Sequence, residues 1–573
     1  MDVLGMPLVA ATRALRQAVA RKKLVNLTGP PGVGKSRLAA DLPHATWVDL
    51  DAPDPFTLLA RTLSDSAVRL LVVDGADGRG RRETLHRALR AAGGPVGRPA
   101  VVVISRIPLV ADPSWGELDP ETIALGPACD TRIGLRATAL DPGARALVIR
   151  LAGGIPLLAD VACRALESGA CDSDPGAVAD HVAAEVGDRL TRELPGRRWQ
   201  HSLRQLATVG SGDEHLLRGG PDAFAALAAL SIVRRTRLGL RLSEPYRALF
   251  ELSFQWRKPQ THRGTRTRAR AYRLAGMAAT DDPGPRSHLA EQGLFLSGDP
   301  LLRRELFPAR DSPVRIRGAE GGDAAAIGAL MRQWAVHSGF DERRCDRLTE
   351  RWAGDDIGAF RVATDPLGKV IGLACMLPVE QRTEGSLEPL LQQHSTAALQ
   401  GGGLFLGAAH CPVPSARAHV LRSILRDGVR SGRLIVSTAN PDYQALVRGL
   451  GFTVHGGIRD DFYRCGRPPE VSTHVFDADR LTGWLGLLAQ EPSQRRSGPP
   501  RPGPPLAPKE KQVLLAYASG LTLKATARRA GITQNTAKDY LGRVKAKYRA
   551  AGRPASTKVE LAQRVREDGL DRG

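Results

Sequence analysis

An eight-residue segment, Gly29–Ser36, combines residue types and a spacing that suit the binding of phosphate groups. Its sequence, GPPGVGKS, fits the pattern G-x-x-x-x-G-K-S, in which glycines let backbone N–H groups close around phosphates. In this pattern the Lys35 ammonium reaches the β- and γ-phosphates, and the Ser36 hydroxyl holds Mg²⁺. This segment, the phosphate loop, predicts a site for ATP or ADP with Mg²⁺; the alternative is a former nucleotide loop that is kept for structure. The predicted binding residues are Gly29, Pro30, Pro31, Gly32, Val33, Gly34, Lys35 and Ser36.

A phosphate loop of this kind lies between a strand and a helix, and the neighbouring sequence predicts both. Residues 24–28, LVNLT, form an apolar run typical of a buried strand, and RLAADL after the loop predicts a helix. A second apolar run, LLVVD at residues 70–74, predicts another strand of the same sheet. It ends in Asp74, which such a sheet aims at the Mg²⁺ beside Ser36. Ser36 and Asp74 are therefore the predicted metal-binding residues.

Three further residues are candidates for contact with the γ-phosphate. Many active ATPases carry, directly after the second strand, a glutamate that orients the attacking water, but this position is Gly75. Asp77 is the nearby substitute and the one candidate catalytic residue, so fast hydrolysis is not expected. A third predicted strand, residues 100–106, ends in Ser105 and Arg106, which could sense the γ-phosphate from the neighbouring strand end.

Four segments, TGPPGVGKSRLA, LLVVDGAD, VVVISRIPL and GGIPLLA, resemble in order and spacing the signal-transduction ATPases (STAND class) of large bacterial LuxR-type regulators. The resemblance covers about residues 1–250. It implies a nucleotide-controlled switch in which Pro156, in a Gly-x-Pro segment, contacts the nucleotide from a helical subdomain. It also implies a winged helix, which the helix–strand–turn–strand–helix rhythm of residues 224–250 fits. We therefore expect a P-loop NTPase domain at residues 1–130 and a helical and winged-helix region at residues 131–310.

Two basic segments in this region allow more than one interpretation. Arg234, Arg235 and Arg237 fall within the predicted winged helix, which is usually an intramolecular packing module. A solvated or interdomain face is therefore favoured for them over a DNA-reading role. The basic stretch at residues 257–273 is equally ambiguous.

A new mixed α/β domain is expected at residues 311–470. Its order of predicted strands and helices, with ANPDYQALVRGLGF near the end, resembles the GNAT acetyltransferase fold over about residues 313–465. That family binds the acyl-CoA pyrophosphate through a Q/R-x-x-G-x-G/A turn, but the corresponding CPVPSARAHV lacks both glycines, and Pro412 and Pro414 remove N–H donors. The family's tyrosine acid corresponds to Val447. Acetyl transfer is therefore not expected, and sensing of a small molecule or an acyl-CoA is favoured over a structural spacer.

The composition limits the class of protein. The 573 residues imply several domains, and no stretch approaches the roughly 20 apolar residues that a bilayer span needs. The N-terminus has no secretion-signal pattern, so a cytoplasmic location is expected. The seven cysteines are scattered without CxxC pairs or a nearby histidine pattern, which predicts reduced thiols that hold no metal.

Positive charge is concentrated at the C-terminal end of the chain. The net charge is +21, and residues 495–573 carry 18 basic and 6 acidic residues, which is +12 of that total. Such a segment attracts a polyanion such as nucleic acid. Residues 471–505 are expected to be a proline-rich linker region, because residues 491–507 contain six prolines.

The last segment, residues 506–573, has four predicted helices separated by short turns, two of which form a helix-turn-helix. The run LAPKEKQVLLAYASGLTLKATARRAGITQNTAKDYLGRVKAKY resembles the LuxR-type DNA-binding domain, although Ala525, Thr526, Ala537 and Tyr540 depart from the family pattern. Rival interpretations are a helical interaction domain and a sigma-factor region-four domain. A sigma factor is disfavoured because the upstream chain has an ATPase pattern and no promoter-melting region.

The start of the predicted recognition helix is where base edges and phosphates are contacted. Thr533 is expected to cap this helix, and Lys538 is the best single candidate for a DNA contact. Residues further along, and those on the preceding helix, are expected to touch the phosphate backbone. The predicted DNA-binding residues are Lys524, Arg528, Thr533, Gln534, Asn535, Lys538, Arg543, Lys545 and Lys547.

These features together predict a multidomain α/β plus α protein: a P-loop NTPase with a winged helix, a GNAT-like mixed α/β domain and a C-terminal tetrahelical helix-turn-helix. The favoured function is a LuxR-family transcription regulator that binds double-stranded promoter DNA under the control of ATP or ADP and of a signal at the GNAT-like domain. A homo-oligomer is expected, RNA polymerase is a further candidate partner, and no membrane partner is expected. The alternatives are an acyl-CoA-dependent acetyltransferase with regulatory domains and a nucleotide-dependent scaffold.

Overall fold

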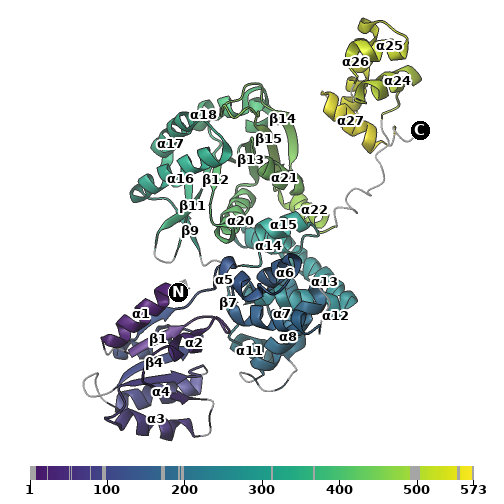
Figure 1. Ribbon diagram of the computed structural model, residues 1–573. Helices are drawn as coiled ribbons and strands as arrows, with labels where there is room; N and C mark the ends of the chain where they lie inside the picture. Colours follow the sequence, from purple (N-terminus) through teal and green to yellow (C-terminus); the bar gives the residue numbers. More distant parts are fainter. Residues whose placement is uncertain are drawn as a thin grey trace. The chain divides into compact units, whose positions relative to one another are not determined.

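The computed structural model divides the chain into two compact units, Met1–Ala489 and Gln490–Gly573 (Figure 1). The structure describes all residues except 1–7, 22–23, 51, 53, 78, 93–98, 170–173, 192–193, 195, 197–198, 311–313, 366–367, 491–503, 520, 551–554, 556, 569 and 571–573. Among the described helices, none is both long and apolar enough to cross a membrane.

The first unit begins with a five-stranded parallel sheet in the order β2-β3-β4-β1-β5. The strands are β1 (Leu24–Thr28), β2 (Ala45–Asp49), β3 (Leu70–Asp74), β4 (Ala100–Ser105) and β5 (Glu121–Ala124). The helices around it are α1 (Leu8–Ala20), α2 (Lys35–Ala40), α3 (Pro55–Ser64) and α4 (Arg79–Ala91). The three strands predicted from apolar runs are therefore confirmed. Because all five strands are parallel, the carboxyl ends of β1, β3 and β4 meet at one edge of the sheet.

A helical region with one small sheet follows. Its helices are α5 (Asp130–Gly134), α6 (Pro142–Ala152), α7 (Pro156–Glu167), α8 (Pro175–Leu190), α9 (Trp199–Val209), α10 (Glu214–Leu217), α11 (Gly220–Ala229), α12 (Tyr246–Arg257), α13 (Pro259–Ala278), α14 (Pro283–Phe295) and α15 (Pro300–Leu306). The antiparallel strands β6 (Ser211–Gly212), β8 (Gly239–Leu242) and β7 (Val233–Thr236) form the sheet in that order. The predicted helix–strand–turn–strand–helix rhythm of residues 224–250 corresponds to α11, β7, β8 and α12.

The third part of this unit is a seven-stranded sheet in the order β14-β15-β13-β12-β11-β10-β9. Its strands are β9 (Arg315–Gly318), β10 (Phe360–Thr364), β11 (Val370–Pro378), β12 (Leu404–His410), β13 (Arg433–Thr438), β14 (Thr453–Gly457) and β15 (Glu470–Val475). The helices are α16 (Ala324–Ser338), α17 (Glu342–Asp356), α18 (Gln381–Leu391), α19 (Ser395–Leu399), α20 (Pro414–Ser431), α21 (Pro441–Gly449) and α22 (Ala478–Leu488). One core lies on the face that α16 and α17 cover, and a second lies on the face that α20 and α21 cover. This part, from β9 to α22, is called the middle domain below.

The region expected to be a linker, residues 471–505, begins within folded structure. Strand β15 pairs with both β13 and β14, and α22 packs against α13 and α14. Leu485 of α22 shares an apolar core with Met277 of α13 and Leu294 of α14. The Trp484 indole N–H donates to the Leu450 carbonyl at 2.6 Å and so also joins α22 to the end of α21. The proline-rich residues 491–503 of the expected linker lie outside the described residues.

Three arginines of α13 have structural partners, which bears on the question that the sequence of this basic stretch left open. Arg266 donates to backbone carbonyls just after α14, Arg270 to a carbonyl just after α22, and Arg273 to carbonyls at the end of α9. Val209 is the last residue of α9, whose carbonyl has no partner within the helix, and the other acceptors lie just beyond helix ends. These three arginines therefore join the helices of the first unit.

The second unit is a small helical bundle of α24 (Pro508–Ala518), α25 (Leu523–Ala530), α26 (Gln534–Ala550) and α27 (Lys558–Glu567). All four predicted helices are confirmed. Helix α24 contacts each of the other three, and their shared core includes Leu514, Leu541 and Tyr548, all with 6% or less of their surface exposed. The predicted N-cap of the third helix is also present, because the Thr533 hydroxyl accepts from the Thr536 N–H at 3.2 Å.

Candidate functional site

The phosphate loop joins β1 to α2, and its backbone adopts a conformation that only glycine adopts readily. Gly29, Gly32 and Gly34 have φ angles of +152°, +72° and +105°. A Cβ on Gly29 would lie 2.4 Å from the Leu125 carbonyl oxygen, and one on Gly32 would lie 2.6 Å from the Leu157 Cβ. Nothing lies within 4 Å of a Cβ on Gly34. The first two glycines are therefore needed both for the turn and for close packing, and the third faces open space.

The Lys35 side chain is folded into the loop. Only 8% of the residue is exposed, and its ammonium donates to the carbonyl oxygens of Gly29 at 2.8 Å and Pro30 at 3.1 Å. This places a positive charge inside the ring of loop backbone, as expected of a phosphate-binding lysine.

Ser36 and Asp74 lie together, as the sequence predicts. The Ser36 hydroxyl donates to Asp74 Oδ2 at 2.6 Å, and Asp74 Oδ1 accepts from the Gly75 N–H at 2.8 Å. Hydroxyl and carboxylate oxygens are the ligands that Mg²⁺ prefers, usually completed by phosphate oxygens and water. The described residues contain no cluster of three or more His, Cys, Asp or Glu side chains placed to hold a metal ion. Ser36 and Asp74 are the residues that could hold a Mg²⁺ here, together with oxygens of a phosphate ligand.

Asp77 and Arg106, from neighbouring strand ends, are paired with each other. Asp77 Oδ1 accepts from the Arg106 backbone N–H at 2.7 Å, and its Oδ2 lies 3.2 Å from Arg106 Nε. Arg106 also reaches Ser231, just before β7, at 3.3 Å. Both oxygens of Asp77 are thus engaged in holding Arg106, and orienting a water molecule would require this pair to open.

The predicted sensor Ser105 lies in the interior of the sheet. It is fully buried, its hydroxyl donates to the Ile107 carbonyl at 2.8 Å, and it accepts from the Asn26 side-chain amide at 2.8 Å. This network ties β1 to β4. Of the two predicted sensors, Arg106 is the one whose side chain extends toward a neighbouring part of the fold.

Two helices from the following region contact the phosphate loop. The Leu157 N–H, one residue after Pro156 in the first turn of α7, donates to the Gly32 carbonyl at 3.2 Å. The Tyr246 hydroxyl, at the first residue of α12, donates to the Pro31 carbonyl. The Pro156 segment therefore lies against the loop, and its contact with a nucleotide stays a prediction. The contact of Tyr246 with the loop is not predicted from the sequence, because no motif marks this residue.

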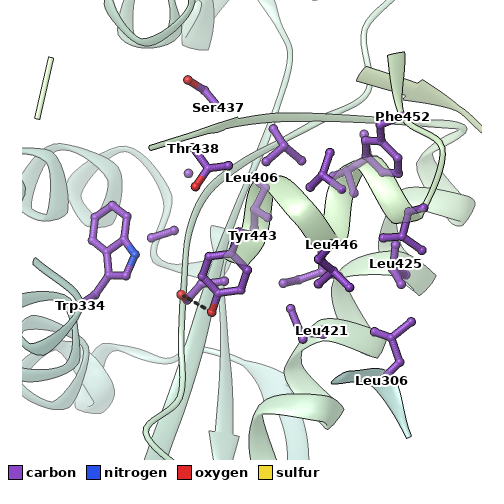
Figure 2. A pocket seen from close by; sticks show the side chains of 18 residues that line it. Leu306, Trp334, Leu406, Leu421, Leu425, Ser437, Thr438, Tyr443, Leu446 and Phe452 are labelled. Atoms are coloured by element: carbon purple, nitrogen blue, oxygen red, sulfur yellow. Dashed lines mark hydrogen bonds between the residues drawn. The ribbon is translucent and has the colours of Figure 1, made fainter. Parts of the chain in front are cut away.

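A separate cavity lies in the middle domain, where two parallel strands diverge. Strands β12 and β13 pair only over Leu404–Leu406 and Leu434–Val436, and a cavity of about 70 Å³ opens beyond the last pair (Figure 2). Most of its lining is apolar, with the hydroxyls of Ser437, Thr438 and Tyr443 among the lining groups.

Tyr443, on α21, is one of the three hydroxyl-bearing side chains that line this cavity (Figure 2). Its hydroxyl donates to the Ala409 carbonyl at 3.4 Å, and burial raises its pKa above the ordinary value. Val447, which the family resemblance aligned with a tyrosine acid, lines the same cavity one helical turn later. The turn before α20 contains Pro412, and α20 itself begins at Pro414, so neither residue offers an N–H group.

In the second unit most predicted DNA-binding side chains are exposed. Lys524 and Arg528 on α25, and Gln534, Asn535, Lys538 and Arg543 on α26, are exposed, whereas Lys545 is partly buried. The turn between the two helices passes through Gly531, whose φ is +66°. The first turns of α26 therefore present polar and basic groups to solvent.

Lys547 differs from the other predicted DNA contacts. Its ammonium donates to Glu510 Oε2 at 2.6 Å and to the Pro505 carbonyl at 3.0 Å, and Glu510 is 4% exposed. The lysine thereby neutralises a buried carboxylate that also accepts from the Ala507 N–H at the start of α24. Lys547 joins α26 to α24 within the bundle.

No family model matches the chain, and no curated protein sequence matches it. Among solved structures, part of the chain is similar in fold to acetyltransferases. One is described as histone acetyltransferase HPA2 and related acetyltransferase from Corynebacterium glutamicum; it is 17% identical, 28% of this chain and 94% of that chain are covered, and the TM-score is 0.23. Another is the spermidine/spermine N-acetyltransferase SpeG from Vibrio cholerae, at 19% identity, 28% and 89% coverage and a TM-score of 0.19.

Part of the chain is also similar to a mutant of RuvB from Thermotoga maritima. That match has 14% identity and a TM-score of 0.28, and it covers 41% of this chain and 90% of that chain. At such identities and TM-scores these similarities concern the fold of parts of the chain and carry no argument about its activity.

Proposed function

We propose that this chain is a DNA-binding transcriptional regulator whose activity is controlled by ATP or ADP at the phosphate loop. The observation that carries the proposal is the loop itself: a buried lysine ammonium lies within a ring of glycine-rich backbone, next to a hydroxyl–carboxylate pair. The resemblance of its segments to the STAND class, and of the second unit to the LuxR-type DNA-binding domain, supports the same function.

The residues of the loop suit a nucleotide with Mg²⁺. Lys35 would exchange its contacts with two loop carbonyls for phosphate oxygens, which are stronger acceptors because they are charged. Ser36 and Asp74 would hold Mg²⁺, which neutralises phosphate charge when it is bound. The Asp77–Arg106 pair favours a slow ATPase, or none, because the carboxylate is already engaged.

A nucleotide can control DNA binding only if it binds one conformation of the chain more tightly than another. The contacts of Leu157 and Tyr246 with the loop supply a route for this preference, because both come from outside the sheet that carries the loop. A nucleotide that changes the loop carbonyls must change these two contacts as well. A DNA-binding homo-oligomer is the conformation that we expect the nucleotide to select.

The experiment that tests the proposal captures genomic DNA fragments with the full-length chain, with ATP and Mg²⁺ at near-physiological salt. A few enriched sites with a shared motif are expected. They should disappear with Lys538→Ala, because this exposed lysine lies in the second turn of α26. Arg549→Ala, at the far end of the same helix, is the matched control and should keep the motif. A flat profile with and without nucleotide would count against the proposal and favour the scaffold alternative.

A second candidate, an acyl-CoA-dependent acetyltransferase, is favoured by one feature: the Tyr443 hydroxyl in the cavity where β12 and β13 diverge. The prolines at the start of α20 argue against it, because they remove N–H donors at the expected pyrophosphate turn. Calorimetric titration of the full-length chain with CoA is expected to show no saturable heat. Saturable binding that is lost in Tyr443→Phe would instead show a CoA site in this cavity, which the acetyltransferase candidate requires.

A further inference from the structure

Helix α12 connects the phosphate loop to a buried cluster of charges. Its first residue, Tyr246, is 1% exposed and donates to the Pro31 carbonyl of the loop. The next residue, Arg247, is 3% exposed and pairs with both Glu244 and Glu251, the latter one turn along α12. A shift of the loop therefore acts on a helix whose first turn is anchored by a buried ion pair.

Glu251 also binds the guanidinium of Arg303, which belongs to α15. The pair is bidentate, with Arg303 Nη1 at 3.1 Å from Oε1 and Nη2 at 2.7 Å from Oε2. The guanidinium groups of Arg247 and Arg303 both lie over the Phe295 ring, at 4.9 and 4.6 Å from its centre. Burial alone would raise the pKa of Glu251, but Arg303, His262 and Arg247 hold it well below its ordinary value. A buried carboxylate keeps its partners because losing one leaves an uncompensated charge.

The apolar side of α15 belongs to the core of the middle domain. Leu302 and Leu306 are fully buried in the core that α20 and α21 share, and Leu306 lines the cavity between β12 and β13. Two arginines of α20 fix the end of α15: Arg417 pairs with Glu305 at 2.9 Å, and Arg422 donates to the Leu306 carbonyl. The seven residues of α15 thus carry the charged partner of α12 on one side and a wall of the cavity on the other.

We propose that α15 couples the phosphate loop to the cavity of the middle domain, so that nucleotide binding rearranges the cavity through Tyr246, Glu251 and Arg303. The inference rests on the proposed nucleotide site and adds the route by which that site controls the rest of the chain. The route is contiguous: loop carbonyl, first turn of α12, shared carboxylate, α15 and cavity wall. Binding at the two sites is then linked. If nucleotide changes the affinity of the cavity for its ligand by some factor, that ligand changes the affinity of the loop for nucleotide by the same factor.

Hydrogen exchange measured by mass spectrometry on the full-length chain tests this coupling. Exchange is compared without nucleotide and with saturating ADP and Mg²⁺. Amides of α15 and α21 are expected to change their exchange rate by about threefold or more when nucleotide binds. Arg303→Met should abolish this response, because the methionine fills similar space without the two bonds to Glu251. Arg304→Met is the matched control and should keep the response, because Arg304 is 73% exposed and pairs with Glu305 at the surface.

A second, isosteric variant covers the possibility that Arg303→Met folds poorly. Tyr246→Phe removes only the hydroxyl that donates to the Pro31 carbonyl, and it should reduce the response of α15 at least about twofold. Tyr272→Phe, whose hydroxyl donates to Asp213 at the surface, is its control and should respond like the wild type. Unchanged exchange in α15 and α21 of wild-type protein with calorimetrically confirmed bound nucleotide would overturn the coupling and leave the nucleotide site standing. Absence of nucleotide binding to the wild type would remove both.

Discussion

Replacement of Lys35 by alanine tests the nucleotide site most directly, because this ammonium has two separable roles. Without nucleotide it donates to the Gly29 and Pro30 carbonyls, at 2.8 and 3.1 Å. With nucleotide it is expected to donate to phosphate oxygens instead. A hydrogen bond to a charged group contributes about 1.5–3 kcal/mol, so Lys35→Ala should raise the dissociation constant for ADP with Mg²⁺ roughly 10- to 150-fold.

The same substitution also affects the nucleotide-free protein. The two carbonyl contacts have a charged donor, and such hydrogen bonds contribute about 1.5–3 kcal/mol each, so the variant should lose at most about 3–6 kcal/mol of unfolding free energy. Isothermal titration calorimetry gives the affinity, and urea unfolding of the same samples shows that the variant is folded. Arg37→Ala, two residues further along α2 with an exposed side chain, is the control and should bind ADP like the wild type. A folded Lys35→Ala variant whose affinity stays within threefold of wild type would refute the assignment of this lysine to phosphate.

Three further predictions concern the second unit and the middle domain. Lys547→Met should speed hydrogen exchange in α24 and α26 about 5- to 10-fold, because it leaves the buried Glu510 carboxylate without its cation. This effect is smaller than for a fully buried ion pair because Lys547 is partly exposed. Arg549→Met should change the exchange less than about twofold. Burial would raise the pKa of Glu510, but Lys547 holds it below the ordinary 4.5. The pair should therefore stabilise the bundle fully above about pH 4.5 and lose this effect as the pH falls through the lower pKa of the folded state. Hydrogen exchange in α24, corrected for intrinsic rates, should show this loss, and Glu510→Gln should abolish the pH dependence. Gly407→Ala would place a Cβ 2.8 Å from the buried indole ring on α17 and should lower the free energy of unfolding, measured in urea, by about 1–3 kcal/mol. At Gly354 nothing lies within 4 Å of an added Cβ, so Gly354→Ala should instead stabilise α17 by about 0.5–1 kcal/mol.

The parts of the molecule that the sequence predicts well are those that depend on local sequence patterns. The strands at residues 24–28 and 70–74 are short, apolar and bounded by turns, so their burial follows from their own composition. The Ser36–Asp74 contact follows from topology, because the parallel strands of one sheet end at the same edge and only β4 lies between β1 and β3. The four helices of the second unit follow from apolar periodicity and from Gly531 and Thr533 at the turn.

Helical geometry explains two differences between the expected and the observed sites. Tyr443 and Val447 are one turn apart on α21 and share a face, so both line the cavity although the family pattern selects the later one. Lys538 and Lys547 are nine residues apart, which at about 100° per residue is two and a half turns. The two lysines therefore point to opposite sides of α26, one toward solvent and one toward Glu510. Charge alone does not distinguish these two positions, but helical phase does.

Contacts between residues far apart in the chain lie beyond such patterns. Tyr246 follows Pro31 by 215 residues, and Arg303 follows Glu251 by 52, so no local period relates either pair. Each contact depends on how whole helices pack. The sequence shows that Arg303 and Glu251 are charged, but only the packing of α15 against α12 makes them a buried pair.

The carbonyls of four consecutive loop residues show why these distant contacts matter for the phosphate loop. Gly29 and Pro30 accept from the Lys35 ammonium, Pro31 accepts from Tyr246, and Gly32 accepts from the Leu157 N–H. In a trans peptide the N–H points away from the preceding C=O, so a carbonyl held on the outer side of the loop turns the next N–H toward its inner side. Tyr246 thereby orients the peptide that carries the Gly32 N–H. The helices outside the sheet thus set the direction of the donors that a phosphate would meet, which is why we expect their movement and nucleotide binding to be linked.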